Sequence, residues 1–326
     1  MVGNFSRKLI DHINRTISEG GQTLVLRSRR AWSTALQCQS CGEILKCPHC
    51  NVSLSHHKID GKMACHYCGT TRQYTGTCTK CGGQLTDLGA GTQRIEEEAA
   101  VLFPTARIAR LDSDTAQNKT YEARTIKDFA KGEIDILIGT QIITKGFDFE
   151  KLRLVAVIAA DTLLGLQDFR ADEKAMHLLE QFRGRCSRRE QKGLFVIQTS
   201  QPEHPIYQSM LTDNPDSFNE RLLTERRDFD FPPYTRNIEL TVKDIYEDRV
   251  ERMAGKLAAC LGDFSITGPY TPIISKIADM HIRKIRLSLK KDRYLNTKKA
   301  ELKKIIGTFE KAKKYTGHII IDVDPA

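Results

Sequence analysis

The chain has 326 residues, a formal net charge of +9, 40% hydrophobic residues and 28% charged residues. This length favours two or three domains, and the ordinary globular composition excludes collagen-like, fibrous and disordered classes. The longest purely apolar run, residues 154–160, is far shorter than the roughly 20 residues that cross a bilayer. Residues 1–20 are polar and charged. We therefore expect a cytoplasmic protein without a membrane anchor or signal peptide.

The first part of the chain predicts a helix and a strand. Apolar residues at helical spacing follow Ser6, a residue type that caps helices, so a helix is expected over residues 5–17. Residues 23–28 form a short apolar run of strand type.

Helices alternate with short apolar strands after residue 91. This alternation predicts an α/β fold with a parallel sheet covered on both faces, whose ligands bind beyond the carboxyl ends of the strands. Asp112, Gly139-Thr140-Gln141 and Asp161 fall at such ends. The expected helices span residues 92–102, 121–131 and 172–185, and the expected strands span residues 106–112, 135–140, 152–160 and 194–199.

The tandem prolines Pro232 and Pro233 predict a boundary. Beyond them, the pattern of strands and helices predicts a small α+β domain. Its expected strands span residues 238–244, 283–291 and 318–324, with a helix over 248–261 and a lysine-rich helix before the last strand.

Eight of the ten cysteines lie in one segment as four Cys-x-x-Cys pairs. Two such pairs supply the four thiolates of a structural zinc site, so the segment predicts two Zn²⁺ sites whose metal supplies its fold. A thioredoxin-like redox pair needs only one such motif, and the missing signal peptide disfavours disulfides. Adjacent and nested pairing both fit the spacing. The pairs are Cys38/Cys41, Cys47/Cys50, Cys65/Cys68 and Cys78/Cys81.

The residues that follow the cysteine pairs also carry information. Cys41, Cys68 and Cys81 are each followed by glycine, which lets the turn backbone point N–H groups at the sulfurs. The two remaining cysteines, Cys186 and Cys260, are expected to be buried small side chains or idle thiols.

Two polar segments are candidates for ligand binding. Gln181, Arg185 and Arg188 lie on one face of a predicted helix, where two arginines suit phosphate oxygens; a solvated basic helix end also fits the spacing. The loop over residues 139–149 follows a buried strand and is a ligand-loop candidate. It offers Gly139, Thr140, Gln141, Lys145 and Gly146.

The last 46 residues, 281–326, hold 13 Lys/Arg against 5 Asp/Glu. Basic side chains recur along a predicted strand and suggest a sheet face or edge that contacts the DNA backbone. A lysine-rich soluble surface is the alternative. The basic residues of this strand are Arg283, Lys284, Arg286, Lys290 and Lys291.

These motifs together resemble the PriA family of primosomal replication-restart helicases over essentially the whole chain. The resemblance rests on GTQIITKGFDF (139–149), DFRADE (168–173), QFRGRCSRR (181–189) and the eight-cysteine block. It includes SRRAW (28–32), GAGTQRIEEE (89–98), FPTARIARLDSDT (103–115) and FPPY (231–234).

The resemblance implies three regions. Residues 1–35 and 87–230 would form the second RecA-like lobe of the helicase, and residues 36–86 a zinc-binding insertion. Residues 231–326 would form a C-terminal α+β domain that binds DNA and partners. The family's zinc pairing is nested, with Cys38, Cys41, Cys78 and Cys81 on one ion and Cys47, Cys50, Cys65 and Cys68 on the other.

The resemblance also implies the activity. The implied activity is that of an ATP-dependent 3′ to 5′ DNA helicase that would recognise stalled forks and restart replication by primosome assembly. Gln181 would face ATP, and Arg185 and Arg188 would be arginine fingers. The implied partners are single-stranded and forked DNA, single-stranded-DNA-binding protein and the proteins that load the replicative helicase, in a nucleoid-associated location. The implied nucleotide-coupling residues are Gly139, Thr140, Gln141, Lys145, Gly146 and Asp148.

The chain departs from the family pattern at three places. Gly184-Arg185-Cys186-Ser187-Arg188 stands for the usual Gly-Arg-Ala-Gly-Arg, and Phe147 stands for a histidine. Trp32 stands for a tyrosine, and we expect it to pack in the core rather than stack on a base.

No Gly-x-x-x-x-Gly-Lys-Ser/Thr loop occurs in these residues. ATP and Mg²⁺ would then bind only together with a first motor lobe, and the chain alone is expected to hydrolyse no ATP. The alternative is a non-enzymatic zinc-containing module that binds DNA or protein. A transcription-type zinc ribbon would not explain the motor-like lobe.

Overall fold

The computed structural model describes residues 1–27, 35–57, 61–88, 91–112, 115–144, 149–164, 168–186, 193–212, 214–312 and 317–325. The chain divides into two compact units. The first unit comprises Met1–Thr34 and Leu88–Phe218, and the second comprises Ala35–Asp87 and Asn219–Ala326. The second unit thus joins the Cys-rich segment to the C-terminal segment, while the domain boundaries expected above stay predictions.

A five-stranded parallel sheet forms the centre of the first unit, in the order β10-β9-β1-β8-β7. β1, β8 and most of β9 are buried on both faces, as their unbroken apolar sequences predicted. The parallel sheet inferred from the sequence is therefore confirmed. Its strands are β1 (Gln22–Arg27), β7 (Ile108–Leu111), β8 (Ile136–Gly139), β9 (Leu152–Ile158) and β10 (Leu194–Ile197).

Helices cover both faces of this sheet. α1 and α2 pack against Val25, Ile138 and Ala156 on one face, and α4 contacts β9 while α3 contacts β7. The Ser6 side chain accepts a hydrogen bond from the Leu9 backbone N–H at 3.2 Å, so the predicted cap of α1 is confirmed. The helices here are α1 (Arg7–Ser18), α2 (Thr92–Leu102), α3 (Lys119–Lys131), α4 (Ala171–Cys186), α5 (Pro205–Thr212) and α6 (Pro215–Asp228).

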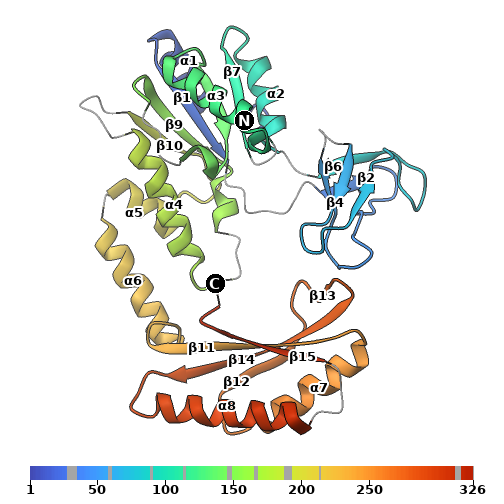
Figure 1. Cartoon of the computed structure of the whole chain (residues 1–326). Coiled ribbons are helices and arrows are strands. Elements are labelled where there is room, and N and C mark those ends of the chain that lie inside the picture. Colours follow the sequence, from blue (N-terminus) through green and yellow to red (C-terminus); the bar gives the residue numbers. More distant parts are fainter. Residues whose placement is uncertain are drawn as a thin grey trace. The chain divides into compact units, whose positions relative to one another are not determined.

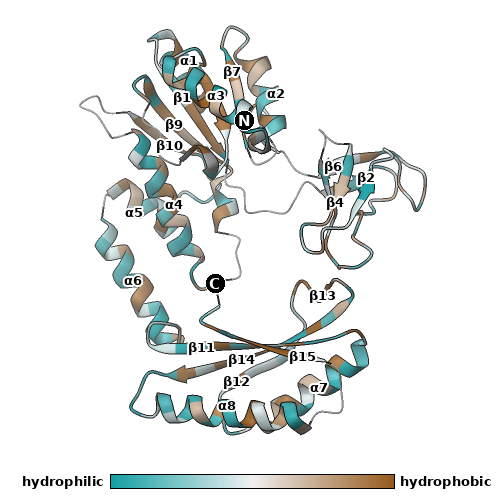
Figure 2. Cartoon of the chain, in the orientation of Figure 1, coloured by the Kyte–Doolittle hydropathy of each residue, from teal (hydrophilic) through white to brown (hydrophobic). Residues whose placement is uncertain are grey.

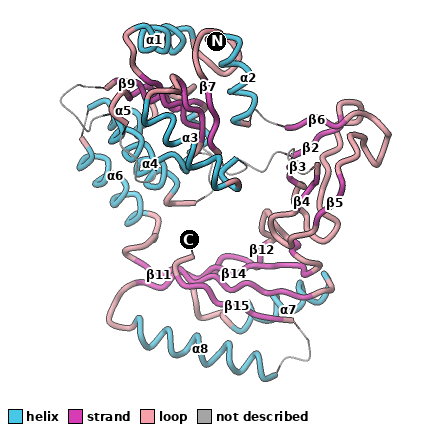
Figure 3. Tube along the Cα trace, turned by 45° about the horizontal axis from the view of Figure 1, so that its top comes forward, coloured by secondary structure: helices cyan, strands magenta, loops and turns pink. Residues whose placement is uncertain are grey.

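The Cys-rich segment forms a sheet of very short strands, in the order β5-β4-β3-β2-β6 (Figure 3). Its buried cluster contains Leu36, Leu54 and Met63, but half of its ten members are cysteines. A cluster this small buries little apolar area, so burial alone cannot specify the fold. The strands are β2 (Ala35–Cys38), β3 (Ser55–His57), β4 (Lys62–Ala64), β5 (Thr71–Gln73) and β6 (Leu85–Leu88).

The C-terminal segment is an antiparallel sheet in the order β12-β14-β11-β15, with a short strand β13 paired to β14. α7 and α8 both cover one face of it (Figure 1). The α+β domain predicted from the sequence is confirmed. Its elements are β11 (Thr235–Asp244), α7 (Glu247–Cys260), β12 (Ile266–Tyr270), β13 (Lys276–Ile277), β14 (Met280–Lys290), α8 (Leu295–Ala312) and β15 (His318–Val323).

None of the helices in the described part of the chain has the length and apolar character needed to cross a membrane.

Candidate functional site

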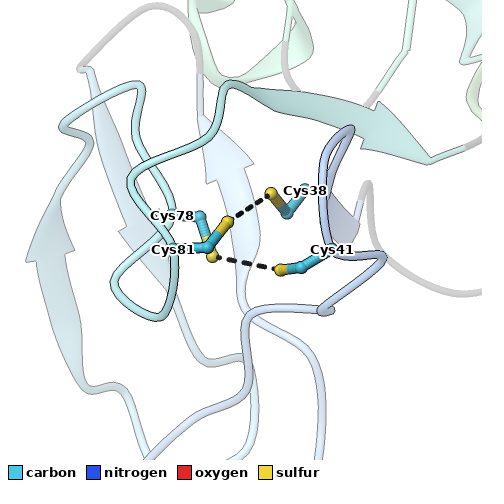
Figure 4. A group of neighbouring side chains, drawn as sticks. All are labelled: Cys38, Cys41, Cys78 and Cys81. Carbon is cyan, nitrogen blue, oxygen red and sulfur yellow. Dashed lines mark hydrogen bonds between the residues drawn. The ribbon is translucent and has the colours of Figure 1, made fainter.

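The eight clustered cysteines form two groups of four, and the pairing is nested. Within each group the four sulfur atoms all lie within 4.8 Å of one another. In the outer cluster, the Cys38 and Cys81 sulfurs are 3.4 Å apart and the Cys41 and Cys78 sulfurs are 3.8 Å apart (Figure 4). We call Cys38, Cys41, Cys78 and Cys81 the outer cluster, and Cys47, Cys50, Cys65 and Cys68 the inner cluster.

The spacing of the sulfurs fits a zinc ion. Zinc–sulfur bonds of about 2.3 Å in a tetrahedron place sulfur atoms about 3.8 Å apart. The inner cluster agrees, since the Cys47 and Cys68 sulfurs lie 3.6 Å apart. Four sulfurs with no nitrogen or oxygen donor form a closed set, which is typical of a structural metal site rather than a catalytic one.

Hydrogen bonds favour the thiolate form at one cysteine of each cluster. The backbone N–H of Cys41 lowers the pKa of the Cys38 thiol to about 6. Hydrogen bonds from the Thr70 hydroxyl and backbone lower the pKa of Cys68 to about 6. Burial instead raises the pKa of Cys50 to about 12. A bound metal cation would counter this effect, because coordination deprotonates a thiol.

The glycines after the cysteine pairs have a role different from the one expected. Gly42, Gly69 and Gly82 adopt positive φ angles of +72°, +76° and +73°. Their N–H groups donate to the carbonyl oxygen of the first cysteine of the same pair, at 2.9–3.0 Å, and not to sulfur. In the outer cluster, the sulfurs instead accept from the N–H groups of Lys80 and Gly83, each at 3.4 Å.

The remaining two cysteines differ in exposure. Cys186 is buried, and burial raises the pKa of its thiol to about 12, as expected of a small core side chain. Cys260 is exposed at the end of α7, so it is not a buried side chain, and of the two expectations only that of an idle thiol fits it.

Gly139 and Thr140 lie at the carboxyl end of β8, in the middle of the parallel sheet. A side chain at Gly139 would collide with the Leu111 carbonyl oxygen and the Ile143 side chain. The glycine is therefore required by close packing of β7 against β8, and it does not adopt a positive φ. Thr140 is buried and Gln141 is exposed. Lys145, Gly146 and Asp148 lie outside the described residues.

The two carboxylates at this edge are held by neighbouring loops. Asp112 accepts hydrogen bonds from the Thr92 hydroxyl and from Arg110, the latter at 2.8 Å. Asp161 accepts from the Thr199 hydroxyl and from the Ser200 N–H at 2.8 Å. Both residues lie at the predicted edge, where their contacts fix the local loops.

Gln181 and Arg185 are one turn apart on α4, as the sequence spacing predicted. Gln181 contacts the His177 ring through its Nε2 atom at 2.8 Å. Arg188 lies outside the described residues. A side chain at Gly184 would meet nothing within 4 Å in the described part of the chain.

Asp168 of the DFRADE motif organises the start of α4. Its carboxylate accepts from the Arg170 N–H at 2.9 Å and from Lys174 Nζ at 2.8 Å. Burial opposes ionisation of this carboxyl, but these hydrogen bonds lower its pKa to about 2.

Three of the five basic residues expected on a DNA-contacting face of β14 lie within 3.7 Å of carboxylate oxygens. Arg283 is buried and pairs with Glu251 at 2.5 Å and Glu247 at 3.1 Å. Lys284 pairs at 2.5 Å with Glu239, which also lies 3.7 Å from Arg286. Alternating side chains of a strand point to opposite faces, so the basic run is divided and largely neutralised.

α8 carries several lysines without an ion pair in the described part of the chain. Lys299, Lys303 and Lys304 have no ion pair within the described residues. Lys303 and Lys304 are exposed, and Figure 2 shows hydrophilic colour along much of α8. Lys290 and Lys291, at and just beyond the end of β14, are also exposed, so the candidate nucleic-acid surface comprises α8 and this end of the strand.

Comparisons with known families match three parts of the chain. Residues 47–72 match the PriA DNA helicase Cys-rich region (CRR) domain. Residues 82–190 match the helicase conserved C-terminal domain. Residues 227–326 match the primosomal protein N C-terminal domain. The first match lies within the predicted zinc-binding insertion, while the second and third begin at residues 82 and 227, a few residues before the predicted starts at 87 and 231.

Curated relatives align with nearly the whole chain. The chain is 35% identical to the replication restart protein PriA of Bacillus subtilis, over 98% of this chain and 40% of that protein. It is 32% identical to the PriA protein of Thermotoga maritima, over 99% of this chain and 43% of that protein. The chain spans less than half the length of these relatives. It belongs to the PriA family of replication restart proteins and corresponds to their C-terminal half.

Proposed function

We propose that this chain is the C-terminal half of an ATP-dependent 3′ to 5′ DNA helicase that recognises stalled replication forks and restarts replication by primosome assembly. The observation that carries the proposal is the alignment with PriA proteins over 98% of the chain. The corresponding location is the cytoplasm, in association with the nucleoid.

In this proposal the first unit is the second lobe of the motor. Gln181 faces ATP, and Arg185 and Arg188 stabilise the transferring phosphoryl group as arginine fingers. The loop over residues 139–148 couples the nucleotide to the DNA strand through Gly139, Thr140, Gln141, Lys145, Gly146 and Asp148. The position of Gly139 and Thr140 at the carboxyl edge of the sheet supports this assignment.

The two cysteine clusters each hold one Zn²⁺ in this proposal, with a structural role. The all-sulfur donor sets and sulfur spacings support it. Single-stranded and forked DNA contact the C-terminal segment, where Lys299, Lys303 and Lys304 have no ion pair with any residue that the structure describes. Single-stranded-DNA-binding protein and helicase-loading proteins are the proposed protein partners.

An ATPase assay with single-stranded DNA tests the motor assignment. We expect no hydrolysis by this chain alone, because it contains no phosphate-loop sequence. With the N-terminal half of a PriA protein supplied, hydrolysis should appear, and Arg185→Ala should lower it about a thousandfold. Arg183→Ala is the matched control, because Arg183 lies on the same helix and pairs with Glu180 at 2.9 Å.

The alternative of a non-enzymatic binding module makes a different prediction. DNA-stimulated hydrolysis by the chain alone, abolished by Arg185→Ala, would contradict the inactivity proposed here. Failure of any N-terminal half to restore hydrolysis would favour the binding module. The genomic sequence upstream of Met1 offers a second check, because a phosphate-loop sequence there supports the helicase.

A further inference from the structure

The inner cluster differs from the outer one in how its first cysteine pair is closed. In three of the four pairs, the residue after the second cysteine is a glycine whose N–H donates to the first cysteine's carbonyl. Asn51 takes that place after Cys50. Its N–H donates instead to the carbonyl oxygen of Lys276, at 3.3 Å. The Cys47/Cys50 pair is therefore closed by a segment more than 200 residues away in the sequence.

That segment is the β13–β14 hairpin of the C-terminal segment, residues 273–282. Lys276 pairs with His281 and Ile277 with Met280, which leaves Ala278 and Asp279 as a two-residue turn. Asn51 contacts the hairpin through its side chain too. Its Oδ1 accepts from the Lys276 N–H at 3.1 Å, and its Nδ2 donates to the Ser275 hydroxyl at 3.0 Å and the Ile273 carbonyl at 3.3 Å.

The turn itself reaches the metal-binding cysteine pair. The Ala278 N–H donates to the Cys50 sulfur at 3.3 Å. The Asp279 N–H donates to the His49 carbonyl at 2.9 Å, and the Asp279 carboxylate meets the His49 ring at 2.7 Å. Amide hydrogen bonds of this kind orient a sulfur ligand and tune its basicity.

The backbone of the turn is held in an unfavourable conformation. Ala278 and Asp279 have φ angles of +49° and +64°. Two-residue turns of this type favour Asn-Gly, because a Cβ atom is strained at positive φ. Such strain persists where the surroundings fix the backbone. Here the contacts with His49 and Cys50 provide that constraint, and Ile274 and Ile277 pack against the cysteine-containing core.

We propose that the β13–β14 hairpin is an intramolecular cap of the inner cluster, so that metal retention at this cluster depends on the C-terminal segment. The coupling is reciprocal, since a group that stabilises the bound metal is itself stabilised by metal binding. Among the described residues, the amides that contact the outer-cluster sulfurs come from its own loops, so the outer cluster should not share this dependence. The inference rests on the proposed binding of zinc.

Chelator-driven zinc release from the full chain tests the cap. Ala278→Pro removes the N–H that bonds to Cys50 and cannot adopt the positive φ. We expect one of the two zinc equivalents to leave about 10-fold faster or more, while the other keeps its rate. Ala278→Gly is the matched control, because it keeps the N–H and suits the turn, and both rates should stay unchanged. Thiol alkylation read by mass spectrometry should then mark Cys47, Cys50, Cys65 and Cys68 first.

A second variant keeps the test independent of damage to the turn. Asn51→Gly gives the pair the residue found in the other three and removes the side chain that grips the hairpin. We expect faster amide exchange at residues 276–282 with both zinc ions retained. Unchanged release in Ala278→Pro, equal acceleration of both ions, or unchanged hairpin exchange in Asn51→Gly would each overturn the proposal. A purified chain without zinc would instead contradict the zinc binding that the proposed function includes.

Discussion

The first unit, a lobe built on the parallel sheet, and the Cys-rich segment are stabilised by different interactions. The lobe contains strands such as β8, in which every residue is buried, packed between helices. The Cys-rich segment has strands of three or four residues and a core cluster in which half the members are metal-binding candidates. Apolar burial therefore explains the first region, whereas the proposed metal ions would supply the cross-links that hold the second. A change that destabilises one region should therefore leave the other region folded.

Removing metal should have the largest effect. Structural zinc contributes on the order of 10 kcal/mol per site to folding. Chelation should therefore unfold residues 35–88 while the lobe stays folded, as measured by amide hydrogen exchange before and after chelation. Equal loss of protection in β8 and β9 would show that the two regions are not independent.

Gly139→Ala should destabilise the lobe and leave the Cys-rich segment unchanged. The added methyl group would collide with the Leu111 carbonyl and Ile143. Overpacking of this kind costs about 1–3 kcal/mol. We expect a lower free energy of unfolding for the lobe and an unchanged content of two metal ions, measured by denaturant titration and by elemental analysis. Loss of metal in this variant would show that the lobe and the Cys-rich segment do not respond independently.

Asp168→Asn should remove a smaller, pH-dependent contribution at the start of α4. Hydrogen bonds from Lys174 and Arg170 lower the folded pKa of Asp168 from 3.8 to about 2. Its stabilising contribution is therefore complete above the ordinary pKa and is lost as pH falls towards 2. Because the side chain is partly exposed, we expect a difference of about 1 kcal/mol at neutral pH. Amide exchange in α4 should detect it, and a difference that persists at pH 2 would contradict the assignment.

The same acid titration also compares metal release from the Cys-rich segment with the loss of the Asp168 contribution. Metal binding requires deprotonated thiolates, so acid should release metal from the Cys-rich segment. We expect that region to unfold at a higher pH than the one at which Asp168 loses its contribution. The order of the two transitions in a single acid titration checks this.

Lysine neutralisation should have the smallest effect on the fold and act on DNA binding alone. Replacing Lys299, Lys303 and Lys304 by Gln should lower the slope of log affinity against log salt by about 2 for single-stranded DNA, if each contacts a phosphate. Lys284→Gln and Arg286→Gln together form the control, because both residues face Glu239. A larger change of this slope in the control would indicate that DNA contacts β14 rather than α8. Binding titrations at several salt concentrations decide between them.

Local sequence patterns predicted the regular elements well. Residues 92–102 form α2 with the expected bounds, and the Ser6 cap lies where its spacing placed it. These features depend on contacts between neighbours in the sequence, or on burial that apolar periodicity reveals. The α+β character of the C-terminal segment followed for the same reason.

Long-range features were harder to predict. Spacing left the cysteine pairing open, because either arrangement satisfies two tetrahedra; only the resemblance implied the nested one. The division of basic residues on β14 depends on Glu239, Glu247 and Glu251, which come from other elements. The contacts of Asn51 with the hairpin were missed, although the absence of glycine after Cys50 was a visible signal.

The closure of the Cys47/Cys50 pair by the hairpin has a consequence for the order in which the protein matures. The Ala278 amide and its sulfur partner are 228 residues apart. Synthesis at about 5–20 residues per second places about 10–50 s between their appearance. A newly made Cys-rich segment therefore has all eight of its ligands well before its inner pair can be closed. During that interval the Asn51 amide lacks its acceptor, so the inner cluster reaches its final form only once the last part of the chain has folded.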